Sequence, residues 1–327
     1  MTIISSWAHA VGSRMVRAAE VEHEFHLPAG KIRKGAGLEA VARLGKNEEE
    51  VAFCAAVCDF ALARAGCAIG DVDWLIATSE TFHRFPSLGA SLHARLLARE
   101  SCGVLDVGGA CLGLLNALAT AQAMLRAGRA RQILIVTGDC HSRVLTPGQV
   151  KGEFGGLFGD GASAFLLRAA ESTDADPHYR LGEFHFGCSN IYGSAIRIGL
   201  SPKQEIALTF EGEALARAVV EQMERVIEDV ELRSGRKRAD ACALVTHQPN
   251  PRLVALLARQ LKIPASKIPP VARTCGNLGS STCGVGLSMV LSDHSTKPAS
   301  QQGPIFLAAV GPGLLWGGGI LESVAAP

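Results

Sequence analysis

The chain has 327 residues, of which 48% are hydrophobic and 19% are charged, and its net charge is +1. This composition excludes a disordered or fibrous chain and predicts a large core, in one α/β unit or two domains of roughly 150 residues. The near-neutral charge gives no general attraction to nucleic acid or to a membrane surface.

The first residues lack a basic segment followed by a sustained apolar run, so we expect no signal peptide. No stretch approaches the ~18 apolar residues that a membrane-spanning helix needs. We therefore expect a cytoplasmic protein whose ten cysteines are reduced. Because the sequence contains no Cys-x-x-Cys pair, we expect no metal site.

Helices and apolar strands alternate along the first half of the chain. We expect a helix over 48–66, strands over 72–78 and 103–107, a helix over 114–125 and a strand over 132–137. This alternation predicts an α/β fold whose apolar strands are buried in a parallel or mixed sheet.

The second half repeats this order. We expect a helix over 211–230, a strand over 242–246, a helix over 251–261 and a strand over 304–310. Short segments match between the halves in the same order, which predicts an internal duplication.

A polar segment over 171–177 is typical of a surface connection and separates the two repeats. We therefore divide the chain into an N-terminal half, residues 1–172, and a C-terminal half, residues 173–327. A second polar stretch, over 293–302, is interpreted as a loop before the last strand.

Cys111 lies in the turn between the strand over 103–107 and the helix over 114–125. Unpaired N–H groups and the positive end of the helix dipole favour the thiolate there, and the thiolate is the nucleophilic form of cysteine. The alternative is an inert core position, because free cysteine is among the most buried residue types.

Three further loops carry candidate functional groups. His247 directly follows a buried strand, where α/β folds present functional side chains, and it is a candidate base or donor. Asn277 offers a neutral amide between glycines that permit close approach of a ligand. The glycine-rich loop over 311–319 can direct backbone N–H groups at an oxyanion. The alternatives are that His247 is an ordinary turn residue, that Asn277 adopts a left-handed turn, and that the glycine-rich loop serves packing alone.

Together these segments resemble the thiolase superfamily, and most closely its β-ketoacyl-acyl-carrier-protein synthase III branch. The resemblance spans nearly the whole chain. It rests on five motifs in the family's order, the last of them altered: D-V-x-x-A-C-x-G at 106–113, F-G-D-G-A at 158–162, H-Q-x-N at 247–250, G-N-x-x-S at 276–280 and G-G-G-x-x-W-G at 311–317.

The resemblance implies a five-layered αβαβα thiolase-like fold of two similar halves, with Cys111, His247 and Asn277 as catalytic residues. An acyl group would pass from a thioester to Cys111, which would be activated by its helix terminus and by His247. Backbone N–H groups of Cys111 and Gly313 would form the oxyanion hole. His247 and Asn277 would stabilise the enolate that forms as a malonyl thioester, carried by acyl carrier protein, loses carbon dioxide. The enolate would then attack the acyl-cysteine.

The same resemblance implies an acyltransferase of fatty-acid or polyketide-like secondary metabolism. Its substrates would be thioesters of coenzyme A or of carrier-protein phosphopantetheine, with no tightly bound cofactor. It further implies a homodimer in which Phe85 enters the partner's acyl pocket; the alternative is that Phe85 only packs the dimer core. Arg252 matches a position that helps to dock acyl carrier protein, and the alternative there is a solvated charge at a helix start.

The chain departs from the family where coenzyme A would bind. The family's early tryptophan is missing from residues 31–38, and Lys151 stands where the family has an arginine. An adenine held between an aromatic ring and a guanidinium would be lost. We therefore expect either a donor bound to carrier protein, or coenzyme A held differently, with Lys31, Arg33 and Lys34 contacting its phosphates.

Two other functions remain as alternatives. One is an acyltransferase that delivers the Cys111-bound acyl group to a hydroxyl or an amine without forming a carbon–carbon bond. The other is a silent partner subunit of a heterodimer, against which the intact triad argues. Asn277 favours condensation, because its amide serves to stabilise an enolate, whereas plain acyl transfer needs mainly a thiol and a base.

Overall fold

A computed structural model gives the fold and describes most of the chain: residues 1–170, 178–191, 193, 196–200, 206–210, 212–296 and 302–324. The predicted boundary between the halves falls within 171–177, outside the described residues, so the division into 1–172 and 173–327 stays a prediction.

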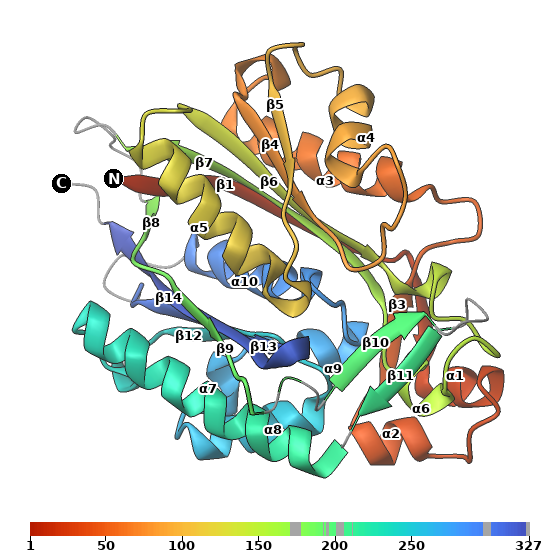
Figure 1. Ribbon diagram of the computed structural model, residues 1–327. Coiled ribbons are helices and arrows are strands. Elements are labelled where there is room, and N and C mark those ends of the chain that lie inside the picture. Colours follow the sequence, from red (N-terminus) through yellow and green to blue (C-terminus); the bar gives the residue numbers. More distant parts are fainter. Residues whose placement is uncertain are drawn as a thin grey trace.

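In the described part of the chain, a ten-stranded mixed sheet forms the frame of the molecule (Figure 1). Its main path runs in the order β12-β13-β14-β8-β1-β7-β6-β4-β5, and β9 pairs with β14. Two small sheets lie outside it, one formed by β2 with β3 and one by β10 with β11. The strands are β1 (Thr2–Val11), β2 (Arg14–Arg17), β3 (Ala40–Arg43), β4 (Trp74–Thr78), β5 (Gly103–Asp106), β6 (Gln132–Cys140), β7 (Asp160–Ala169), β8 (His178–Leu181), β9 (His185–Cys188), β10 (Ile196–Leu200), β11 (Ile206–Phe210), β12 (Ala243–Thr246), β13 (Ile305–Gly311) and β14 (Leu315–Val324).

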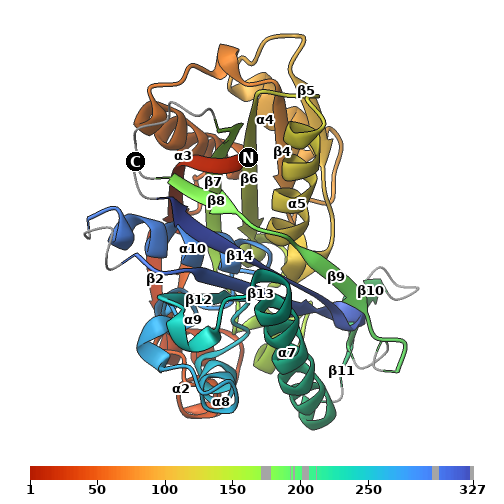
Figure 2. The ribbon, with the colours of Figure 1, turned by 90° about the vertical axis from the view of Figure 1, so that its left-hand side faces the viewer.

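Helices cover both outer faces of the sheet system and fill the space between its two parts (Figures 1 and 2). The α-helices are α1 (Ala18–Glu24), α2 (Lys31–Ala36), α3 (Glu50–Ala65), α4 (Leu88–Arg95), α5 (Gly113–Arg126), α6 (Gly152–Gly155), α7 (Gly212–Ser234), α8 (Pro251–Gln260), α9 (Val271–Cys275) and α10 (Ser281–His294).

The three largest apolar clusters define five layers. Helices α3 and α4 pack on the outer face of the N-terminal strands, and α7 and α8 pack on the outer face of β12 to β14. Between the two parts, α5 and α10 bury side chains against strands of both halves. This is the αβαβα layering that the resemblance implies.

Helix α10 is buried on nearly all sides, whereas α5 leaves Ala123 and Arg126 exposed. After Gly113, α5 has strong helix formers without a further glycine or proline, and its leucines are buried. Helix α10 contains Gly284, where a Cβ atom would collide with the side chain of Ser163 on β7. Glycine is therefore required there, because the helix approaches the sheet too closely for any side chain.

The structure confirms the predicted α/β class and shows each strand and helix predicted above, with ends shifted by a few residues. One interpretation was wrong: residues 315–319 are not loop but the start of β14. Glycines disfavour strands, yet here a Cβ on Gly317 or Gly319 would lie 2.5 or 2.6 Å from the rings of Phe186 and Phe184. The rings of Phe184 and Phe186 pack directly on the backbone of these glycines, and this packing outweighs the low strand propensity of glycine.

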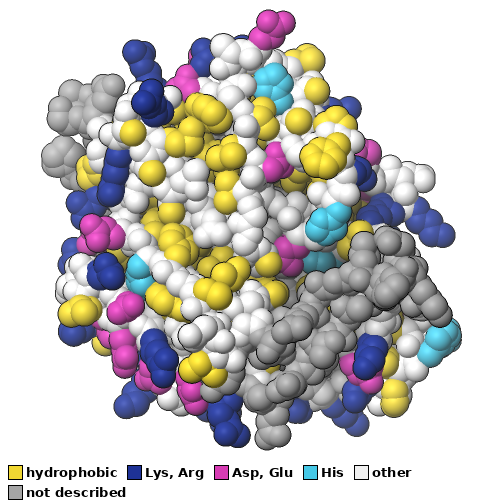
Figure 3. All heavy atoms as spheres, in the orientation of Figure 1, with side chains coloured by type: hydrophobic (Ala, Val, Ile, Leu, Met, Phe, Trp, Pro, Cys, Tyr) yellow, Lys and Arg dark blue, Asp and Glu magenta, His cyan; other side chains and the backbone are white. Residues whose placement is uncertain are grey.

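In the described part of the chain, no helix is both long and apolar enough to cross a bilayer. Basic and acidic side chains are interspersed over the face seen in Figure 3, in keeping with the near-neutral charge.

Candidate active site

A cavity of about 430 Å³ brings together residues from both halves of the chain. Cys111, His247 and Asn277, the three residues singled out by the sequence, all line it. Its other walls are largely apolar and come mainly from α6, α7 and α8, with Phe154, Leu157, Phe158, Leu215, Val219, Met223, Leu253, Leu256 and Leu257 among the lining residues.

Cys111 sits in a short 3₁₀ turn, Ala110–Leu112, immediately before α5, and is only 8% exposed. Cys111 lies at the start of the helix, as predicted, but its thiol does not show the expected preference for the thiolate form. Burial raises the pKa of the Cys111 thiol well above its ordinary value, and the charge of the nearby Glu80 carboxylate raises the pKa further. The resting nucleophile is therefore a neutral thiol, and its proton must leave during acylation.

The glycine loop approaches the thiol through Gly311. A Cβ atom on Gly311 would lie 3.2 Å from the Cβ of Cys111 and 3.5 Å from its Sγ. Pro312 also lines the cavity, and it has no N–H to donate. The carbonyl oxygen of Gly313 accepts a hydrogen bond from the Cys188 thiol at 3.2 Å. The oxyanion-hole role assigned to the N–H of Gly313 stays a prediction.

His247 directly follows β12 and is buried. Its Nδ1 has no hydrogen-bond partner among the described residues. Burial lowers the pKa of His247 to about 4, so its imidazole is neutral at physiological pH. The next residue fixes the loop: the side chain of Gln248 donates to the carbonyl of Pro269 at 2.6 Å and accepts from the N–H of Ala272 at 3.1 Å.

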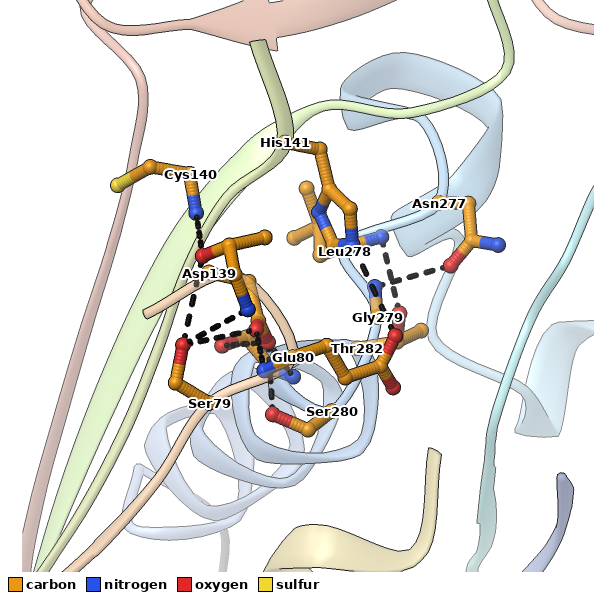
Figure 4. Close-up of polar contacts among 12 residues, drawn as sticks. Ser79, Glu80, Asp139, Cys140, His141, Asn277, Leu278, Gly279, Ser280 and Thr282 are labelled. Carbon is orange, nitrogen blue, oxygen red and sulfur yellow. Dashed lines mark hydrogen bonds and ion pairs between the residues drawn. The ribbon is translucent and has the colours of Figure 1, made fainter. Parts of the chain in front are cut away.

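Asn277 precedes α10 as Cys111 precedes α5. Its backbone N–H donates to the carbonyl of Leu157 at 2.8 Å, and its Oδ1 accepts from the N–H of Gly279 at 2.9 Å (Figure 4). Because Oδ1 is engaged, the Nδ2 end of the amide is the donor left for a ligand. The left-handed residues of this turn are Gly276 and Gly279, so the alternative of a left-handed Asn277 is wrong.

Two polar residues that the sequence analysis did not single out lie beside the triad: Glu80, which is partly buried, and His141, which is buried. Glu80, just after β4, lines the cavity, and its Oε2 is 3.7 Å from Nε2 of His141, which follows β6. The Nδ1 of His141 donates to the carbonyl of Gly159 at 3.2 Å. Burial acts to lower the pKa of His141, but the carboxylates of Glu80 and Asp139 outweigh it and raise the pKa. Position just after a strand, the signal that singled out His247, would have found both residues.

The carboxylate of Asp139 accepts hydrogen bonds both from the segment that carries Glu80 and from the start of α10 (Figure 4). Its Oδ1 accepts a hydrogen bond from the backbone N–H of Glu80 at 2.6 Å. Its Oδ2 accepts from the hydroxyl of Ser280 at 2.7 Å and from the N–H of Ser281 at 2.8 Å. One buried carboxylate from the N-terminal half thereby sets the position of groups from both halves.

Two family models match the chain: 3-oxoacyl-acyl-carrier-protein synthase III over residues 105–189, and the C-terminal region of that synthase over residues 232–323. The β-ketoacyl-acyl-carrier-protein synthase III of Bordetella petrii is 31% identical over 79% of this chain and 76% of its own length. The synthase III of Granulibacter bethesdensis is 29% identical over 98% and 99% of the two chains. The chain belongs to the β-ketoacyl-acyl-carrier-protein synthase III family.

A solved structure supports the fold assignment. A priming β-ketosynthase from a polyketide biosynthetic pathway superposes with a TM-score of 0.86, at 21% identity, over 100% of this chain and 97% of its own. Membership of the synthase III family confirms the predicted thiolase-like fold and makes the chain an enzyme of the acyltransferase class.

The binding residues expected from synthase III lie at different distances from the cavity. Arg252, in the first turn of α8, lines it. Lys31 does not line it but is 4.0 Å from Glu153, which does. Arg33 and Lys151 are exposed and are absent from the lining. The structure thus brings only Arg252 of this group to the catalytic cavity.

Phe85 is 96% exposed. It borders a separate hollow lined by residues between Ala77 and Leu88 and by Asp106 to Gly108, not the cavity that contains Cys111. Its predicted place in a partner's acyl pocket stays a prediction.

Proposed function

We propose that this synthase III family member transfers an acyl group from a thioester to Cys111 and condenses it with a malonyl thioester, releasing carbon dioxide. What supports this proposal is the convergence of Cys111, His247 and Asn277 on one largely apolar cavity. A thiol, a neutral imidazole and an amide are the groups that a decarboxylative condensation requires, and they come from both halves of the chain.

In the first half-reaction, Sγ of Cys111 attacks the thioester carbonyl and expels the donor thiol. The oxyanion of the tetrahedral intermediate accepts hydrogen bonds from backbone N–H groups of the Cys111 turn and of the glycine loop near Gly313. The apolar walls suit an acyl chain, since each buried methylene contributes about 0.8 kcal/mol to binding.

In the second half-reaction, His247 and Asn277 donate hydrogen bonds to the carbonyl oxygen of the malonyl thioester. The neutral state of His247 fits this role, because it provides one N–H without the charge of an imidazolium. The two donors stabilise the enolate as carbon dioxide leaves, and the enolate carbon attacks the acyl-Cys111 thioester.

The substrates and partners follow from the same proposal. The donor is a thioester of carrier protein or of coenzyme A, and the extender is carried by acyl carrier protein, docked in part by Arg252 beside the cavity. No tightly bound cofactor takes part. The active form is a homodimer in which Phe85 contributes to the partner's acyl pocket, and the pathway is fatty-acid or polyketide biosynthesis.

Mass spectrometry of the intact protein tests the first half-reaction. Incubation with a panel of acyl-coenzyme A and acyl-carrier-protein donors is expected to add one acyl mass, and Cys111→Ala is expected to abolish it. An adduct that persists in Cys111→Ala would show that the nucleophile is another residue.

Carbon dioxide release from malonyl-carrier protein tests the second half-reaction. His247→Ala and Asn277→Ala are each expected to slow release while acylation of Cys111 continues. If the acyl group instead moves to a hydroxyl or amine acceptor and no carbon dioxide appears, the condensation proposal is wrong and the plain acyltransferase is right.

A further inference from the structure

A carboxylate is an unexpected group in a cavity built for this chemistry. The mechanism above uses a thiol, a neutral imidazole and an amide, and it assigns nothing to Glu80. Yet Glu80 lines the cavity, and its Oε1 is buried without a hydrogen-bond partner among the described residues. An unpartnered carboxylate oxygen in largely apolar surroundings is costly, so its retention calls for a chemical reason.

The surroundings of Glu80 fix which oxygen is left for chemistry. The backbone N–H of Glu80 is held by Asp139, and Oε2 lies against Nε2 of His141. His141 cannot turn away easily, because its Nδ1 donates to the carbonyl of Gly159 and its ring packs on Phe158 with centroids 4.5 Å apart. Only Oε1 is therefore free to act on a neighbour.

Glu80 and the nucleophile Cys111 line the same cavity. The negative charge of the Glu80 carboxylate is near enough to raise the pKa of the Cys111 thiol, while Oε1 keeps no hydrogen-bond partner of its own among the described residues. Among the described residues, the other titratable groups that face Glu80 are His141 and Asp139 from the β6 end and Cys283 on α10. Of these, His141 and Asp139 hold Glu80 in place, and Cys283 is a fully buried thiol without access to a ligand.

We propose that Glu80 is a further catalytic residue of this enzyme, the base that accepts the proton of Cys111 as the thiol attacks the donor thioester. His141 is the positioning residue that holds the carboxylate. The inference rests on the proposed function, since it concerns the acylation of Cys111.

The step is balanced without any added reagent. The S–H bond of Cys111 breaks as its Sγ–carbon bond forms, and the proton passes to Oε1 of Glu80. When the carbon–sulfur bond of the donor breaks, the departing thiolate takes that proton, which restores the carboxylate. His247 then stays neutral and available for the malonyl carbonyl, so the two half-reactions use separate groups.

The test compares Glu80→Gln, a nearly isosteric change, with Glu50→Gln as a matched control. Glu50 also contacts this loop, through the hydroxyl of Thr81 at 3.3 Å and the guanidinium of Arg84, but it is outside the cavity. Rapid-quench mass spectrometry measures the rate of acyl transfer to Cys111. Glu80→Gln is expected to lower this rate about 10²- to 10⁴-fold, the usual contribution of a general base, and Glu50→Gln to leave it within about 3-fold.

A second readout separates a chemical role from a structural one. Alkylation of Cys111 by iodoacetamide reports the thiolate fraction. Removing the negative charge in Glu80→Gln is expected to move the midpoint of the alkylation profile to lower pH, although acylation becomes slower. A loop that was merely loosened would slow acylation without this shift.

The outcomes are distinguishable. If the wild-type protein accepts no acyl group at Cys111 from any donor, the proposed function itself fails. If the wild type is acylated and Glu80→Gln matches it within about 3-fold, the role of Glu80 is overturned. Should Glu80→Gln not fold, Glu80→Asp keeps the charge and shortens the reach by one methylene. It is expected to slow acylation about 10-fold, and an unchanged rate would equally overturn the inference.

Discussion

Burial of a neutral His247 makes the stability of the fold depend on pH in a predictable direction. The pKa of His247 is about 4 in the folded chain, against 6.5 for a histidine exposed to water in the unfolded chain. Between these values the unfolded chain binds the extra proton, so the stability contributed by this group is present above pH 6.5 and is lost as the pH falls towards 4. The pKa difference of 2.5 corresponds to about 3 kcal/mol, at 1.36 kcal/mol per pKa unit.

His247→Leu tests this value, because leucine has a similar volume and does not titrate. Urea denaturation at pH 7, 5.5 and 4.5 gives the free energy of unfolding of each protein. The wild type is expected to lose about 2.5 kcal/mol more than His247→Leu between pH 7 and pH 4.5, from the linkage relation. The comparison cancels the titration of other groups, such as His9 and His185, whose pKa values burial also lowers. Equal pH slopes for the two proteins would refute the reasoning.

Three further predictions concern other parts of the site. Gly311→Ala places a methyl group 3.2 Å from the Cβ of Cys111; we expect acylation to slow about 10-fold or more with a near-normal melting curve, and a normal acylation rate would contradict this. Asp139→Asn turns an amide N–H₂ towards donors that now bond a carboxylate. We expect the free energy of unfolding, measured by urea titration, to fall by about 3 kcal/mol. A fall below about 1 kcal/mol would show that the network contributes little to stability. Arg252→Glu, at the cavity wall, should raise KM for malonyl-carrier protein about 10-fold at low ionic strength, with the effect shrinking as salt is added; a salt-independent change would argue against electrostatic docking.

Much of the site was accessible from local sequence signals. Cys111 was found from a strand-to-helix turn, and His247 from its place after a buried strand. Both signals are local, because a strand end and a helix start are visible within a dozen residues.

Other features depend on the assembled fold and carry no such local mark. The high thiol pKa of Cys111 arises from burial and from Glu80, which is 31 residues away along the chain, so the helix-dipole argument alone gave the wrong protonation state. Residues 315–319 at the start of β14 were interpreted as a glycine loop because their glycines are explained only by side chains from other segments, such as the rings of Phe184 and Phe186. Likewise, the nearness of Glu80 to Cys111 requires β4, β6 and the α5 start to meet.

The short strand β8 affects how substrates reach the thiol. It pairs on one side with β1, through Ile3 and Ile4, and on the other with β14 over four residue pairs, so backbone hydrogen bonds run without a break from one half to the other. A hinge motion that separated the two halves would have to break the backbone hydrogen bonds of β8, whereas hinge motions generally occur at flexible connections. With the two halves joined in this way, the space open to a substrate at Cys111 is set by the cavity walls, which come mainly from α6, α7 and α8.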